Sequence, residues 1–172
     1  MSALPPSPPE PQIDPPNTVV IRTLDAHGVS YRLLPHDEPV FTVAAAAEQR
    51  GVIMEEMVKS ILLRDRDGKH VMACVTGDVR IDPQAVRAHL GQGWSRLRFA
   101  SAQEIQEVAG FVQGAVAPVG LPEHIPVLFD RGITECEKVN ISSGDPMAGL
   151  ELATDDLFRV SKAQLAHIAA VE

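Results

Sequence analysis

Cysteine is nearly absent from this chain of 172 residues, which contains two, Cys74 and Cys136. Neither has the spacing of a metal-binding pair, and two cysteines do not reach the density of a secreted disulfide scaffold. Cys74 lies in an apolar, strand-like run over residues 71–75, which indicates a position in the core. The six histidines are scattered singly along the chain, so we expect no metal site.

Long apolar runs are also missing. No run of about 18 apolar residues occurs, so a membrane-spanning helix is not expected. The first six residues have neither the basic nor the apolar segment of a secretory signal. These absences lead us to expect a soluble, cytoplasmic protein with no membrane association.

The common catalytic and nucleotide-binding motifs are absent too. The sequence has no Gly-x-Ser-x-Gly elbow, no P-loop, no Gly-x-Gly-x-x-Gly fingerprint and no His-Glu-x-x-His pair. Gly91 and Gly93 mimic part of a dinucleotide fingerprint, but they follow a predicted helix instead of a strand. Ser142 and Ser143 have no base paired with them in the pattern. We therefore expect neither a serine triad nor a metal or organic cofactor.

The net charge of -8 is unfavourable for a nucleic-acid-binding protein as a whole. The charge is unevenly distributed, however, because residues 59–98 hold eight lysines and arginines against four aspartates. This segment could present a basic face to an RNA end, while the acidic remainder keeps the protein soluble. Ordinary surface strands and a helix decorated with arginine would account for the same pattern.

The length predicts one domain with one core. Residues 1–16 contain seven of the fourteen prolines and few large apolar side chains, which predicts a disordered, extended tail. The folded domain is expected to span residues 17–172.

Local signals place the helices and strands within this domain. Helices are predicted over residues 17–27, 43–49, 83–90, 102–109, 155–158 and 162–171. Strands are predicted over residues 31–34, 59–64, 70–76, 127–130, 138–142 and 150–152. Thr42, Asp82 and Ser101 are the expected helix caps. Because strands and short helices interleave without a strict βαβ repeat, we predict an α+β domain with a mixed, curved sheet.

A lysine interrupts one of the apolar strands. Lys59 stands between Val58 and the run Ser60-Ile61-Leu62-Leu63. Such a lysine either extends its ammonium to the edge of the sheet or points into a pocket that receives an anion. Two glycine-bearing loops, over residues 114–121 and 141–145, could surround it.

Several ordered landmarks give the sequence a family resemblance. They are residues 36–43, 58–60, 77–78, 81–82, 99–101, 114–118 and 141–144. Their order and spacing resemble the YbaK-like aminoacyl-tRNA deacylases, which include the editing domain of bacterial prolyl-tRNA synthetases and its free-standing relatives. The match runs from about Thr18 to Val160. It implies a compact, partly barrel-like sheet surrounded by short helices.

The resemblance also implies roles for particular residues. Lys59 would bind a tRNA phosphate or the ester, and the other candidate site residues are Ser60, Gly114, Ala115, Val116, Ala117, Pro118, Ser142, Ser143, Gly144, Asp145 and His36. The loop over residues 114–118 would wall the aminoacyl pocket, residues 142–145 would close it, and His36 would lie near its mouth. Backbone N–H groups at the glycines could stabilise the oxyanion of ester hydrolysis, because glycine lets the main chain approach a ligand closely. In some members a hydroxyl of the substrate is thought to assist the attack.

The sequence departs from both well-marked subclasses of the family. Ser60 follows the lysine where alanine-removing members have asparagine and cysteine-specific members usually have threonine. Ala115, Val116 and Ala117 replace the more polar loop of the cysteine-specific members and predict a small, apolar-walled pocket. We therefore expect a trans-acting deacylase for tRNA mischarged with a small amino acid. An aminoacyl-tRNA synthetase is a second candidate partner.

Two alternative hypotheses place the protein in other classes of function. A non-catalytic module with the same pocket fold could recognise a protein or a small ligand, and the proline-rich tail could dock in an aromatic groove. Its ligand binding should depend little on salt, whereas binding of an RNA end should weaken as salt rises. A DNA-binding regulator is disfavoured, because the one good helix in the basic segment carries only Arg87 and His89 as basic side chains.

Overall fold

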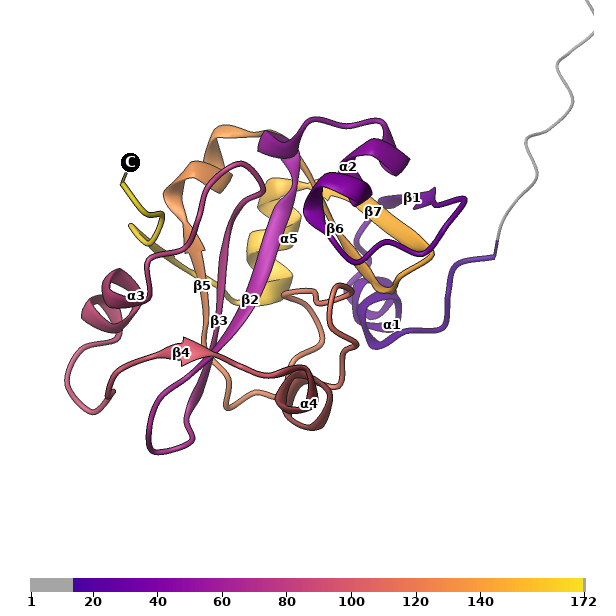
Figure 1. Ribbon diagram of the computed structural model, residues 1–172. Coiled ribbons are helices and arrows are strands. Elements are labelled where there is room, and N and C mark those ends of the chain that lie inside the picture. Colours follow the sequence, from indigo (N-terminus) through magenta and orange to yellow (C-terminus); the bar gives the residue numbers. More distant parts are fainter. Residues whose placement is uncertain (1–13, 172) are drawn as a thin grey trace, which may run out of the picture.

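A computed structural model describes residues 14–171 of the protein (Figure 1). The helices are α1 Val19–Ala26, α2 Val43–Arg50, α3 Pro83–Leu90, α4 Ala102–Glu104 and α5 Thr154–Ser161, with short turns η1 Met54–Glu56, η2 Ile105–Ala109 and η3 Arg131–Glu135. The strands are β1 Tyr31–Pro35, β2 Val58–Arg64, β3 His70–Thr76, β4 Arg98–Phe99, β5 Val127–Asp130, β6 Lys138–Asp145, β7 Ala148–Ala153 and β8 Gln164–Ala166. The predicted α+β class is confirmed.

The strands form two sheets. One has the order β1-β7-β6 and is antiparallel, and the other has the order β4-β2-β3-β5-β8 and is mixed, with β5 parallel to both β3 and β8. A bridge between Met57 and Asn140 links the start of β2 to β6. Neither sheet closes on itself, so a partly closed, barrel-like sheet is not confirmed.

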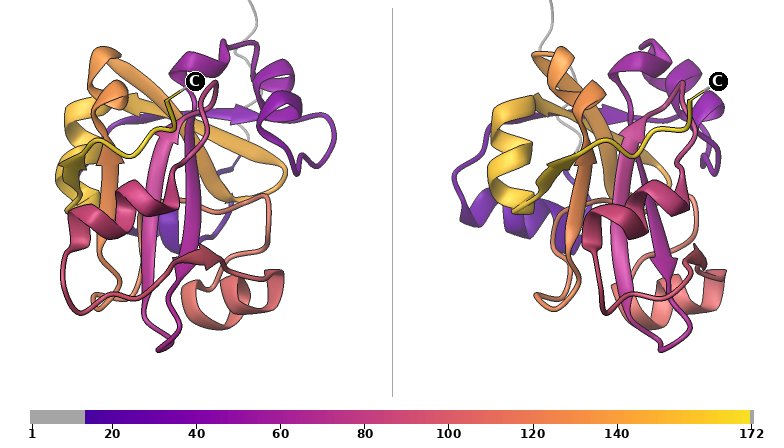
Figure 2. Two further views of the ribbon diagram at one scale, coloured as in Figure 1. Left: turned by 60° about the vertical axis from the view of Figure 1, so that its left-hand side comes forward. Right: turned by 90° about the vertical axis from the view of Figure 1, so that its left-hand side faces the viewer.

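The core has two main layers, because successive residues of a strand face opposite sides of its sheet. Leu62 and Phe129 lie on one face of the five-stranded sheet and pack in the larger cluster, which includes Leu157 of α5. Leu63 lies on the other face and packs in a second cluster with Val86 of α3. Helices α3 and α5 accordingly cover opposite faces of this sheet (Figure 2).

The predicted helix caps are observed. The side chains of Thr42, Asp82 and Ser101 accept hydrogen bonds from backbone N–H groups in the first turns of α2, α3 and α4. Cys74 is fully buried, as predicted, and burial raises the pKa of its thiol to about 12. The cap signals therefore located three helix starts correctly.

The helix predicted over residues 162–171 is wrong. Helix α5 ends at Ser161, and Lys162 adopts a left-handed conformation with φ 55°. The chain then forms β8, which pairs with β5, and the Asp130 carboxylate accepts hydrogen bonds from the N–H groups of Ile168 and Ala169. Pairing with the open edge of β5 outweighed the helical spacing of the apolar residues.

The predicted disordered tail over residues 1–16 lies outside the described residues except for its last three positions. In the described part, residues 14–171, no helix is long and apolar enough to cross a membrane.

Candidate active site

Lys59 lies near the start of β2, where this strand of the five-stranded sheet comes close to β6 of the other sheet. Its ammonium donates a hydrogen bond to the carbonyl oxygen of Val79 at 2.5 Å. Burial lowers the pKa of Lys59, the nearby Asp78 carboxylate opposes this effect, and the Arg80 guanidinium adds to it. The lysine is thus half-buried and anchored by a neutral carbonyl group.

A cavity of about 150 Å³ lies beside Lys59. Its walls come from the segment before and within α2, the start of β2, the loop around residue 114 and β6. The lining residues are Phe41, Thr42, Val43, Ala46, Arg50, Met57, Val58, Lys59, Ser60, Gly114, Val116 and Ser142. Five residues predicted from the sequence, from three separate segments, therefore meet at one cavity: Lys59, Ser60, Gly114, Val116 and Ser142.

The mouth of the cavity forms where two segments touch. Gly114 has φ 89°, and a Cβ atom at this position would lie 2.8 Å from the Cα atom of Phe41. Only glycine allows this conformation together with this approach. The Phe41 side chain is 60% exposed and stands at the rim. The glycine was predicted to approach a ligand, and the structure shows it packed against the neighbouring segment.

The rest of the predicted apolar wall lies elsewhere. Ala115 and Ala117 are buried in the core and do not line the cavity. Pro118 lines a separate surface hollow beside α1. Of the Ala-Val-Ala run, Val116 alone reaches the cavity. Helix α2 and Met57 thus supply more of the residues that line the cavity than this loop does.

The residues after Ser142, 143–145, form the irregular end of β6, where its register with β7 shifts. Ser143 is fully buried, and the Gly144 N–H donates to the Ser142 hydroxyl oxygen at 3.1 Å. The Asp145 carboxylate accepts a hydrogen bond from the Met147 N–H at 2.8 Å. Because the Gly144 N–H is already bound, it is not placed to stabilise an oxyanion as the sequence suggested. These residues support the position of Ser142.

His36 lies behind the cavity wall instead of at the mouth. Its Nδ1 donates a hydrogen bond to the carbonyl oxygen of Pro146 at 2.8 Å, and its Nε2 accepts one from Nε of Arg50 at 3.0 Å. This pair of bonds requires a neutral imidazole with its proton on Nδ1. Burial lowers the pKa of His36, the bond to Pro146 opposes this effect, and the Arg50 charge adds to it. The imidazole therefore positions Arg50.

Arg50 is the main site residue that sequence reasoning missed. It is the last residue of α2, and burial lowers the pKa of its guanidinium to about 10, so it is charged at neutral pH. The guanidinium lies against the backbone of β7 at Gly149. A Cβ atom at this position would overlap Nε and Cζ of Arg50. Gly149 pairs with Ser142 in the sheet, and paired residues project to the same face. A glycine inside a strand pattern was the available signal, because it marks a close approach.

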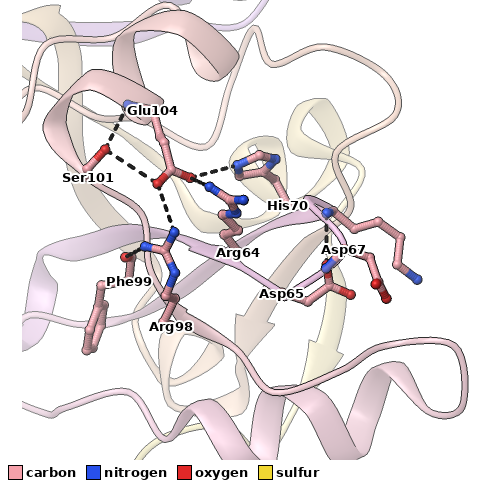
Figure 3. Close-up of polar contacts among 9 residues, drawn as sticks. Arg64, Asp65, Asp67, His70, Arg98, Phe99, Ser101 and Glu104 are labelled. Atoms are coloured by element: carbon pink, nitrogen blue, oxygen red, sulfur yellow. Dashed lines mark hydrogen bonds and ion pairs between the residues drawn. The ribbon is translucent and has the colours of Figure 1, made fainter.

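A second group of basic side chains lies at the far end of β2. Arg64, His70 and Arg98 surround the carboxylate of Glu104, at 3.4, 3.3 and 3.4 Å (Figure 3). Burial alone would raise the pKa of Glu104, but the hydrogen bond from His70 and the charges of the two arginines hold it below its usual value. We call these four residues the Glu104 cluster. It ties α4 to the β2–β3 hairpin, so two basic residues of the 59–98 segment serve the fold.

The donor sets do not suggest a metal centre. Within residues 14–171, no group of three or more His, Cys, Asp or Glu side chains is arranged to hold a metal ion. The cavity instead combines two cations, two serines and a glycine loop. These are groups that bind an anion or a polarised carbonyl.

Known proteins resemble this chain over most of its length. It is 28% identical to the prolyl-tRNA editing protein ProX of Acetoanaerobium sticklandii, covering 89% of this chain and 94% of that protein. It is 25% identical to the multifunctional Ser/Thr-tRNA deacylase ProXp-y of Escherichia coli K12, covering 86% and 89% of the two chains. A crystal structure described as a trans-editing enzyme for prolyl-tRNA synthetase superposes with a TM-score of 0.76 at 26% identity, covering 89% and 96%. Residues 37–160 match the family described as the aminoacyl-tRNA editing domain. This match includes every residue lining the cavity, and the chain belongs to the aminoacyl-tRNA editing domain family.

Proposed function

We propose that this protein hydrolyses the ester of mischarged aminoacyl-tRNA in trans and that its substrates carry a small amino acid. The observation that carries the proposal is the cavity, which gathers Lys59, Gly114 and Ser142 from three distant segments of an editing-domain fold. A volume of about 150 Å³ suits a small aminoacyl group. The relatives named for tRNA editing and deacylation support the same activity.

The reaction adds water to the ester. The oxygen of a water molecule attacks the carbonyl carbon, the carbonyl oxygen gains negative charge, and the bond to the ribose oxygen then breaks. The ribose oxygen takes a proton, and a free amino acid and an uncharged tRNA leave. The protein contributes by orienting the ester and stabilising the oxyanion.

The lining residues suggest how these tasks are divided. Lys59 is proposed to hold the ester or an adjacent phosphate, since its ammonium is fixed at Val79. Within residues 14–171 no atom accepts a hydrogen bond from the Gly114 N–H, which makes this group the proposed oxyanion donor. The lining includes no carboxylate and no imidazole. The free ribose hydroxyl next to the ester is therefore proposed to assist the attack: it accepts a hydrogen bond from the water and passes its own proton to the leaving ribose oxygen as the water's proton replaces it.

The remaining predicted residues are proposed to support this arrangement. Ser60 and Ser142 line the cavity and can contact the aminoacyl group. A synthetase partner is proposed because a structural relative is described as a trans-editing enzyme for prolyl-tRNA synthetase. A cytoplasmic location is the corresponding expectation for an enzyme that acts on tRNA.

Single-turnover deacylation of alanyl-, cysteinyl-, seryl- and threonyl-tRNA tests the proposal. The wild-type protein should cleave at least one of these esters at enzyme excess. Lys59→Ala should slow cleavage by at least about 100-fold, the loss expected when a positioning cation is removed. Its melting temperature should stay within a few degrees of wild type. Failure to cleave any ester, or unfolding of the variant in place of selective inactivation, would contradict the assignment.

A further inference from the structure

The cavity carries positive charge that its own lining does not neutralise. The lining includes Arg50 and Lys59 but no aspartate or glutamate. Within residues 14–171, Arg50 forms no ion pair. Its recorded contacts are the neutral imidazole of His36 and the sulfur of Met57, which is 3.9 Å from Nη1. A charged group that has lost part of its water needs an acceptor.

The guanidinium keeps unused donors that can serve a ligand. Arginine has five N–H donors in a fixed plane. Nε uses one of them on His36, and one from Nη1 faces the weak acceptor Met57 Sδ. Among the described residues, none accepts a hydrogen bond from Nη2 of Arg50. The cavity is where this group meets space for a ligand.

Arg50 lines the cavity together with another residue of α2 and with apolar side chains. Ala46 lies one helical turn before Arg50, so the two residues share a face of α2, and both line the cavity. Ala46 and Met57 are buried and form its apolar wall, whereas Phe41 stands at the exposed mouth. Arg50 and Lys59 thus line one cavity, so a single ligand can contact both residues.

We propose that Arg50 determines specificity by binding an oxygen atom on the side chain of the aminoacyl group. Esters with a side-chain hydroxyl or carboxylate are then preferred over apolar esters of the same size. This inference rests on the proposed function, because it assigns the substrate class of the same cavity. It replaces the purely apolar pocket expected from residues 115–117.

The preference for oxygen-bearing esters follows from the effect that an apolar side chain would have on Arg50. It would displace water from the guanidinium and leave its free donors without an acceptor, which disfavours binding. The guanidinium cannot easily turn away, because His36 holds Nε and Gly149 provides the space that it occupies. A donor fixed before the ligand arrives discriminates better than a flexible one.

Matched esters test the proposal. The kcat/KM values of seryl- and alanyl-tRNA are compared on one tRNA, and likewise those of threonyl- and valyl-tRNA, whose side chains have nearly the same shape. Wild type should prefer each oxygen-bearing ester by about tenfold or more. Arg50→Met should remove most of this preference by slowing the oxygen-bearing esters while alanyl-tRNA changes less than about threefold. The kcat/KM of aspartyl-tRNA is measured as well, and its comparison with that of seryl-tRNA shows whether a carboxylate or a hydroxyl is preferred.

Two outcomes would overturn the proposal. An unchanged preference in Arg50→Met shows that Arg50 does not read the side chain. An equal loss for all esters shows that it binds the tRNA backbone or supports the fold. Arg32→Met is the matched control, because Arg32 is exposed and pairs with Glu151, and its ratios should equal those of wild type. If Arg50→Met does not fold, Arg50→Gln is used, because a glutamine amide can keep the bond to His36 without the charge, and retention of the full preference in this variant counts against the proposal.

A binding assay separates this inference from the proposed activity. Stable amide analogues, 3′-serylamino- and 3′-alanylamino-3′-deoxyadenosine, cannot be hydrolysed as esters, and their binding is read as a shift in melting temperature. The seryl analogue should give the larger shift in wild type but not in Arg50→Met. If this holds while no ester is cleaved, the inference stands and the hydrolase assignment falls. If esters are cleaved with no dependence of preference on Arg50, the reverse is true.

Discussion

The two ends of β2 carry cations in contrasting environments. At its far end, Arg64 and two other basic side chains converge on the Glu104 carboxylate (Figure 3). At its near end, Lys59 and Arg50 are held by a carbonyl oxygen and a neutral imidazole. A carboxylate neutralises charge and ties the fold together, whereas neutral acceptors orient a cation and leave its charge available. The contrast distinguishes a structural cluster from a site for a ligand.

Removing the central carboxylate should produce the largest loss of stability. Glu104→Gln leaves the guanidinium groups of Arg64 and Arg98 close together without a counter-charge, which should cost about 2–3 kcal/mol of unfolding free energy. The side chain of Glu104 is only 17% exposed, so water compensates poorly. Chemical denaturation measures the loss, and deacylation by the folded fraction should be unchanged. Reduced turnover with intact stability would remove the distinction between the two ends.

A matched control isolates the cluster from a general effect of charge. Glu107 lies in η2, is exposed, and accepts a hydrogen bond from the Gln103 amide at 2.8 Å. Glu107→Gln removes the same charge from the same segment, and it should change the unfolding free energy by less than about 0.5 kcal/mol.

Filling the space beneath Arg50 should have a smaller effect on stability and a selective effect on the site. In Gly149→Ala the new methyl group would overlap the Arg50 guanidinium and force it off His36. Overpacking of this kind costs about 1–3 kcal/mol. The preference for oxygen-bearing esters should fall with it, measured as the seryl-to-alanyl ratio.

The double variant Gly149→Ala/Arg50→Ala tests the cause of that loss. With the guanidinium absent, the methyl group meets no obstacle, so the two changes should be clearly non-additive in unfolding free energy. Additive losses would show that Gly149 is needed for a reason other than Arg50.

The smallest expected effect is a difference in pH dependence between the two ends. The pKa of His36 is lowered on folding, so its contribution is fully present above the unfolded value near pH 6.5 and is lost as pH falls through the folded value. The pKa of Glu104 is also lowered, and its contribution disappears only as pH falls from about 4.3 through the folded value. Unfolding free energies against pH for wild type and His36→Gln should differ in slope near and below pH 6.5. Identical slopes there would show that folding does not lower the pKa of His36.

Local signals in the sequence predicted most of the fold. Caps at Thr42, Asp82 and Ser101 were found because each bond joins residues within one helical turn. The helix expected at residues 162–171 was wrong because the pairing of β8 with β5 is a contact between distant segments. The prediction of a partly closed sheet was not confirmed for the same reason, because closure depends on pairing between strands that are distant in the sequence.

The site was predicted in part for the same reason. Lys59, Ser60, Gly114, Val116 and Ser142, which the family resemblance suggested, line one cavity, and their roles in it stay predictions. Arg50 was not singled out, because it follows the helix predicted over residues 43–49 and nothing adjacent to it indicates burial. Its place depends on the missing side chain of Gly149, 99 positions away in the chain. The role of a missing side chain can be recognised only when the three-dimensional positions of both segments are known.

The bridge between Met57 and Asn140 gives the cavity one more property. Ser142 belongs to the three-stranded sheet and Ser60 to the five-stranded sheet, so a ligand between them touches both. Whatever binds there also holds the two sheets together, and it lowers the population of molecules in which they have separated. A bound mischarged tRNA would then protect the protein from unfolding and proteolysis until its ester is hydrolysed.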